Sequence, residues 1–142
     1  MKHMVIACYT VLACVWVACD NSDNAHSDEF EYHADIHAPD ASNKHLDDTI
    51  HIEVEFESHT GMIVHHVNVK IFNKVSGTVV FSKPADAHVH ASSGQYVFED
   101  DFILSTAHGI DAHSDYVLEA KVWGHDEGIS EVNESIEFHV EP

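Results

Sequence analysis

The sequence predicts an all-β protein built as an antiparallel β-sandwich, and three observations favour this class. From about residue 30 onward, apolar residues alternate with polar ones in short segments, which is the period of two that marks half-buried strands. No window after residue 20 has the 3.6-residue periodicity of an amphipathic helix. Glycine-containing turn signals separate the segments, at positions 61, 77, 94, 109, 124 and 128.

The clearest strand is residues 50–57, in which four apolar side chains alternate with one histidine and three glutamates. The same alternation predicts the other strands, and residues 63–71 carry an apolar phase that includes His65. Six or seven strands of this length, joined by short turns, fit one sandwich domain. In chain order, the expected strands are residues 30–37 (the weakest), 50–57, 63–71, 79–82, 96–104, 116–123 and 135–140.

The last two predicted strands carry a more specific pattern. Ser114-Asp115-Tyr116 opens the penultimate strand, and a Gly-containing turn at 123–128 closes it. A tyrosine at this point resembles the tyrosine corner of immunoglobulin-type domains. The sequence therefore predicts a seven-stranded Ig-like sandwich of the fibronectin III or cadherin-like kind.

Residues from about 44 to 141, together with the N-terminal segment, resemble a family of uncharacterised His-rich bacterial lipoproteins with a single Ig-like domain. The resemblance covers the strand order, the Asp115-Tyr116 corner and a lipobox-like motif described below. Where that resemblance implies histidines in the strand at 96–104, this chain has Glu99-Asp100-Asp101 instead. The resemblance implies a fold and a location, but no activity.

Residues 1–18 are expected to be a lipoprotein signal peptide. Lys2 precedes an apolar run from residue 5 to 18, which is too short for a comfortable transmembrane helix. The run ends in Val17-Ala18-Cys19, which predicts that Cys19 carries the lipid, although Trp16 is unusual in such a motif. Cys14 is the alternative lipidation site, and cleavage after residue 18 without a lipid, or an uncleaved anchor, is a further one.

The acidic segment 19–31 has no apolar periodicity, so we expect a flexible tether followed by a β-sandwich domain at 32–142. This organisation predicts a cell-envelope protein that is lipid-anchored to the outer membrane, on its periplasmic or its outer face. Cysteines occur only at positions 8, 14 and 19, so the predicted domain contains no thiol. A disulfide framework and a thiolate metal site are therefore excluded there.

The composition restricts the partners. The chain has 25 acidic residues against six lysines and no arginine, which gives a formal net charge of −19. Such a chain repels nucleic acid and anionic lipid headgroups and attracts cations. It also has 15 histidines, the side chain that most often binds transition metals. A solvated His-rich surface without any specific site is the alternative interpretation.

The predicted strand order brings many of these histidines together. Successive antiparallel strands reverse direction, so the connections after the strands at 50–57, 79–82 and 116–123 lie at one end of the sandwich. We predict a reversible site for Zn²⁺, or Cu²⁺ or Ni²⁺, because imidazoles and carboxylates suit these ions. His88 and His90 are the favoured ligands, since residues two apart in an extended chain share a side. The expected further ligands are His65, His66, His125 and Asp126, with His59, Asp86 and Glu127 as possible additional ones.

Other functions are weaker hypotheses. An Ig-like interaction module would contact another envelope protein or a glycan through Lys70, Lys121 and Trp123. Acidic residues of the tether could bind Ca²⁺, but they lack the loop spacing of a dedicated site. An enzyme is not expected, because the chain has neither a strained nucleophile turn nor a glycine-rich phosphate loop.

Overall fold

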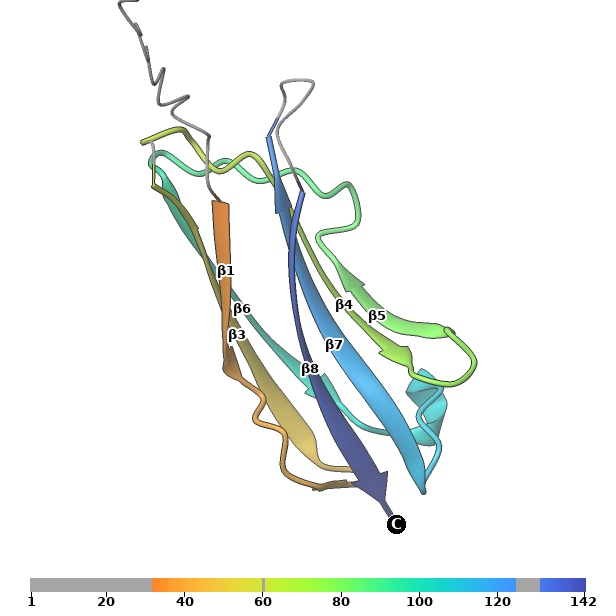
Figure 1. Ribbon diagram of the computed structural model, residues 1–142. Helices are drawn as coiled ribbons and strands as arrows, with labels where there is room; N and C mark the ends of the chain where they lie inside the picture. Colours follow the sequence, from red (N-terminus) through yellow and green to blue (C-terminus); the bar gives the residue numbers. More distant parts are fainter. Residues whose placement is uncertain (1–31, 60, 125–130) are drawn as a thin grey trace, which may run out of the picture.

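The alternating segments form two antiparallel sheets packed face to face, as the computed structural model shows for residues 32–59, 61–124 and 131–142 (Figure 1). The all-β sandwich is therefore confirmed. The smaller sheet has the order β1-β3-β6, from β1 (Tyr32–Ala38), β3 (Thr49–Ser58) and β6 (Gln95–Ile103). The larger sheet has the order β2-β8-β7-β4-β5, from β2 (Lys44–His45), β8 (Val132–Glu141), β7 (Ser114–Trp123), β4 (His66–Asn73) and β5 (Val79–Lys83).

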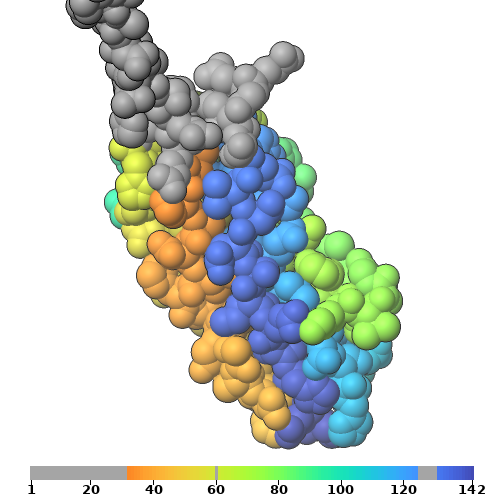
Figure 2. Space-filling view, in the orientation of Figure 1, coloured from red at the N-terminus to blue at the C-terminus, as the bar shows by residue number. Residues whose placement is uncertain are grey.

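The core lies between the sheets and is made by the apolar phase of each strand. Side chains of β3, β4 and β7 at alternate positions have no exposed surface, which is what the period of two demands. One side of the sandwich is closed by β1 against β8, which lie side by side in Figure 2. At the opposite side an ion pair of 2.5 Å joins Lys83 of β5 to Asp100 of β6.

Tyr116 confirms the predicted corner at the start of β7. Its ring is fully buried, and its hydroxyl accepts a hydrogen bond from the backbone N–H of Asp111 at 2.8 Å. The same hydroxyl donates to the carbonyl of Gly109 at 3.5 Å. These bonds fasten the connection between β6 and β7, which includes a short 3₁₀ helix, η1 (Thr106–His108), to the strand that follows it.

Two details differ from the sequence prediction. β2 is an additional strand of two residues that pairs in parallel with β8, and it is too short to show any periodicity. The strand expected at 63–71 begins only at His66, and the apolar phase shifts before it. Val64 is fully buried while Ile63 is 39% exposed, so His65 does not continue the buried face of β4. Among the described residues, no helix is long and apolar enough to cross a membrane.

Candidate functional site

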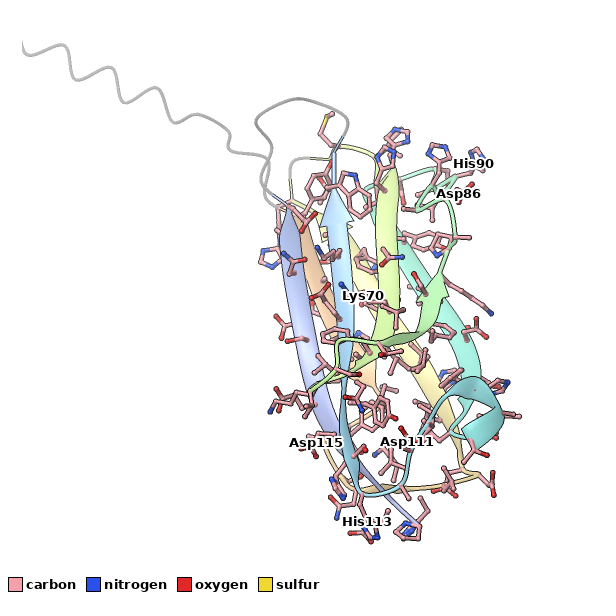
Figure 3. All side chains as sticks on the ribbon, turned by 90° about the vertical axis from the view of Figure 1, so that its right-hand side faces the viewer. Lys70, Asp86, His90, Asp111, His113 and Asp115 are labelled. Atoms are coloured by element: carbon pink, nitrogen blue, oxygen red, sulfur yellow. The ribbon has the colours of Figure 1, made fainter. Side chains whose placement is uncertain are left out.

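The predicted convergence of loops occurs at the end of the sandwich where β3 and β7 finish and β4 and β6 begin (Figure 1). We call it the histidine end, and define it by His33, His59, His65, His66, Asp86, His88 and His90. Figure 3 shows Asp86 and His90 at this end, whereas Asp111, His113 and Asp115 lie at the other. The antiparallel strand order was therefore sufficient to place these groups at one end.

His66 and His88 face each other across a short backbone bridge between β4 and the β5–β6 connection. The N–H of Val67 donates to the carbonyl of Ala87 at 3.1 Å, and the N–H of Val89 donates to the carbonyl of His65 at 2.9 Å. These bonds flank the two histidines rather than join them. In such a non-hydrogen-bonded pair the opposing side chains lie at their closest, with Cα atoms about 4.5 Å apart.

His88 is the common neighbour of three other imidazoles. Its ring centre lies 4.9 Å from that of His90, 5.5 Å from that of His66 and 6.2 Å from that of His65. The first two contacts are edge-on, at interplanar angles of 85° and 65°, and the third is stacked at 22°. The backbone bridge and the His-x-His spacing together create this cluster.

The distances can be compared with those of a metal complex. A Zn–N bond of about 2.1 Å places the ion about 3.2 Å from the centre of an imidazole ring. Two rings that share one ion then have centres about 4.5 Å apart at a right angle and about 5.2 Å apart at the tetrahedral angle. The His88–His90 separation lies in this range, His66 lies slightly beyond it, and His65 is about 1 Å too far.

The remaining predicted ligands are distributed differently. Within the described residues, no group of three or more His, Cys, Asp or Glu side chains is already placed to hold a metal ion. Asp86 is exposed, and its carboxylate accepts a hydrogen bond from the N–H of His88 at 3.3 Å, so it orders its own loop. His59 packs edge-on against His33 of β1, with ring centres 4.4 Å apart. His125, Asp126, Glu127 and Cys19 lie outside the described residues.

His33 was not singled out as a ligand by the sequence, although a signal for it was present. It is the second residue of β1 and stands opposite Glu57 in the register of β1 with β3. His59 follows Glu57 by two positions, so the register alone brings the two histidines together. Because the strand at 30–37 was the weakest of those predicted, its register could not be assigned.

The surface of the alternative interaction hypothesis is electrostatically occupied. Lys70 forms an ion pair with Glu119 at 2.8 Å, and Lys121 forms one with Glu131 at 2.7 Å. Trp123 is only partly exposed, and the His66 ring stacks on it at 5.4 Å with an interplanar angle of 12°. The expected combination of unpaired lysines around an open tryptophan is therefore not what this face presents.

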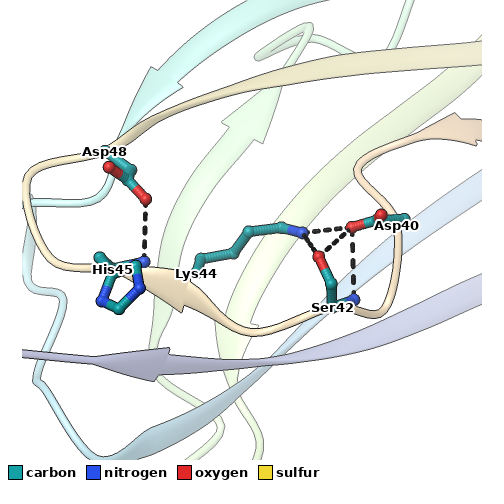
Figure 4. A network of polar contacts seen from close by, with 5 residues as sticks. All are labelled: Asp40, Ser42, Lys44, His45 and Asp48. Atoms are coloured by element: carbon teal, nitrogen blue, oxygen red, sulfur yellow. Dashed lines mark hydrogen bonds and ion pairs between the residues drawn. The ribbon is translucent and has the colours of Figure 1, made fainter.

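A separate polar network lies at the opposite end, around a cavity of about 270 Å³. Lys44 donates hydrogen bonds to Asp40 and to the Ser42 hydroxyl, and Asp48 accepts one from the backbone N–H of His45 (Figure 4). The bond from Lys44, followed by that from Ser42, lowers the pKa of Asp40 to about 2. This network fixes the chain between β1 and β3 and contains charges of both signs.

Histidines on the outer faces of the sheets have carboxylate partners. His51 bonds to Asp101 at 2.9 Å, and His139 bonds to Asp115 at 2.7 Å. The hydrogen bond with Asp101 is the main cause of a raised pKa for His51. These exposed pairs link neighbouring strands, as expected for solvated polar residues.

No protein-family model matches the chain, and no curated protein matches it in sequence. Among solved structures, the chain is similar to the CARDB domain of the PF1109 protein from Pyrococcus furiosus, determined in complex with di-metal ions. The identity is 14% and the TM-score 0.47, over 79% of this chain and 96% of that one. It is also similar to the C-terminal domain of wzt, at 13% identity and a TM-score of 0.45, over 79% and 71% of the two chains. These likenesses concern the fold alone.

Proposed function

We propose that this chain is an extracytoplasmic binding protein, not an enzyme, that captures or buffers Zn²⁺, Cu²⁺ or Ni²⁺ at the histidine end of its β-sandwich. A lipid on Cys19 would hold it to the membrane. The observation that carries the proposal is the position of His88, whose imidazole has three others within 6.2 Å. His88 and His90 are the primary ligands, and His66 is the next.

The donor chemistry restricts the ion. No cysteine occurs after residue 19, so the ligands in the sandwich are imidazoles and carboxylates. Imidazole suits Zn²⁺, Cu²⁺ and Ni²⁺, whereas Cu⁺ prefers sulfur ligands and Mg²⁺ and Ca²⁺ prefer an all-oxygen set. The net charge of −19 raises the concentration of cations near the surface.

The geometry favours reversible binding over a permanent structural site. Half-buried His66 and His88 are held by the backbone bridge, while exposed His90 must lose rotamer freedom to bind. Two or three imidazoles completed by water leave an open coordination position, unlike the closed four-ligand sets of structural zinc. Protonated imidazole cannot bind a metal, so affinity falls as the pH is lowered through about 6.5.

The test is calorimetry on the full chain, purified without a histidine tag and freed of metal by a chelator. Zn²⁺, Cu²⁺ and Ni²⁺ are titrated into the wild type and into the double variant His88→Ala/His90→Ala. We expect wild-type dissociation constants below about 100 μM, weakened at least about tenfold in the variant.

A matched control removes two exposed imidazoles far from the histidine end, in His37→Ala/His45→Ala, and should bind like the wild type. Wild-type binding weaker than about 1 mM would contradict the proposal. So would equal affinity in the wild type and the His88→Ala/His90→Ala variant.

A further inference from the structure

We propose a second metal site at the histidine end, on the other sheet, formed by His33, Glu57 and His59. It extends the proposed function, because it takes the same class of ion, but none of its ligands belongs to the cluster around His88. The set of two imidazoles and one carboxylate is one that Zn²⁺, Cu²⁺ and Ni²⁺ accept.

Backbone pairing brings these three residues together. β1 and β3 are antiparallel, and His33 stands directly opposite Glu57. Side chains opposite each other in such a pair have Cβ atoms about 4.5–5.5 Å apart, on the same face of the sheet. His59 follows the end of β3 and reaches back to His33, with the ring centres 4.4 Å apart and the planes at 89°. This separation is close to the value of about 4.5 Å for two imidazoles bound at a right angle to one ion.

Glu57 has a partner that orients it. The side-chain amide of Gln95, on β6, donates a hydrogen bond to Oε1 of Glu57 at 3.3 Å. Carboxylates that bind metals are commonly held by such outer hydrogen bonds, which fix their direction. Exposed His59 supplies the adjustable ligand, because its ring can turn about its side-chain torsions to meet the ion.

The charge of the surrounding sheet favours a cation. β1, β3 and β6 contain no lysine, and the chain has no arginine. Outward positions of these strands carry carboxylates in a continuous register, with Asp35 opposite Glu55 and Glu53 opposite Glu99. A divalent ion at His33 and His59 therefore lies beside several uncompensated negative charges, whose attraction is strongest at low ionic strength.

The experiment is equilibrium dialysis of the full, tag-free chain against excess Zn²⁺, with the bound metal measured per chain. We expect two ions for the wild type, and one each for His33→Ala/His59→Ala and for His88→Ala/His90→Ala. The variant that lacks all four histidines should bind none at these positions. Circular dichroism of each variant verifies that the sandwich is folded.

Glu57→Gln tests the carboxylate, with Glu53→Gln on the same strand as its matched control. Loss of a direct ligand should cost at least as much as loss of an outer partner, which typically weakens metal affinity about 10- to 100-fold. We therefore expect Glu57→Gln to weaken one of the two binding events by about tenfold or more, and Glu53→Gln to leave both close to wild type.

The two sites fail independently. If His33→Ala/His59→Ala binds as many ions as the wild type with the same affinities, the second site is refuted and the cluster around His88 is unaffected. If that variant loses one ion while His88→Ala/His90→Ala loses none, the second site stands and the proposed function of the His88 cluster fails.

Discussion

Replacing Tyr116 with phenylalanine tests the corner that fixes the β6–β7 connection. The substitution keeps the fully buried ring and its contact with Phe138 but removes the hydroxyl. The N–H of Asp111 then loses an acceptor at 2.8 Å, and the carbonyl of Gly109 loses a long contact at 3.5 Å. A buried polar group left without its partner costs about 1–3 kcal/mol, and Asp111 is exposed enough to recover part of this from water.

We therefore expect Tyr116→Phe to lower the free energy of unfolding by about 1–2 kcal/mol. The corresponding fall in Tm is roughly 4–10 °C for a domain of this size. Denaturant unfolding measures the loss, with an unchanged m-value showing that the same surface is exposed. Tyr96→Phe is the control, because Tyr96 is a half-buried tyrosine whose ring packs on Phe56. The account of the corner is wrong if Tyr116→Phe is as stable as the wild type, or if Tyr96→Phe loses as much.

Three further outcomes are expected. Asp101→Asn should return the raised pKa of His51 toward 6.5, because it removes the hydrogen bond that favours the protonated ring; an NMR pH titration measures this. The pair therefore stabilises the fold fully below pH 6.5, while Asp101 is ionised, and loses this contribution as the pH rises through the raised pKa; equal pH profiles of unfolding for the wild type and Asp101→Asn would contradict this. Lys44→Met should raise the pKa of Asp40 from about 2 toward 3.8, again by NMR titration, and an unchanged value would mean that Lys44 is not its main partner. Zn²⁺ at about 100 times its dissociation constant should stabilise the fold by about 2.7 kcal/mol, seen as a rise in Tm that a chelator reverses.

The strands could be predicted where the sequence shows a sustained period of two, as in β3 and β7. β2 could not, since two residues cannot show periodicity and their pairing with β8 depends on the folded chain. The phase before β4 was wrong because Val64, rather than His65, turns into the core where the chain crosses between sheets.

The gathering of histidines at one end follows from strand direction alone, so the sequence predicts it well. The pairing within that end depends on register, which alternation does not specify. His59 was grouped with the ligands around His88, yet its recorded ring contact is with His33, because the register of β1 on β3 brings these two side chains together. The bridge that sets His66 against His88 joins a strand to an irregular loop and has no signature in the sequence.

The central claim is that transition metals bind at the histidine end, and paramagnetic broadening tests it without any substitution. Substoichiometric Cu²⁺ is added to the ¹⁵N-labelled full chain, and the backbone NMR signals are followed. The account predicts that signals from His66 and from residues 87–90 broaden first, while those of Lys44–His45 and Thr106–His108 at the opposite end stay sharp. Uniform broadening over the whole chain, or broadening that begins at the opposite end, would contradict it.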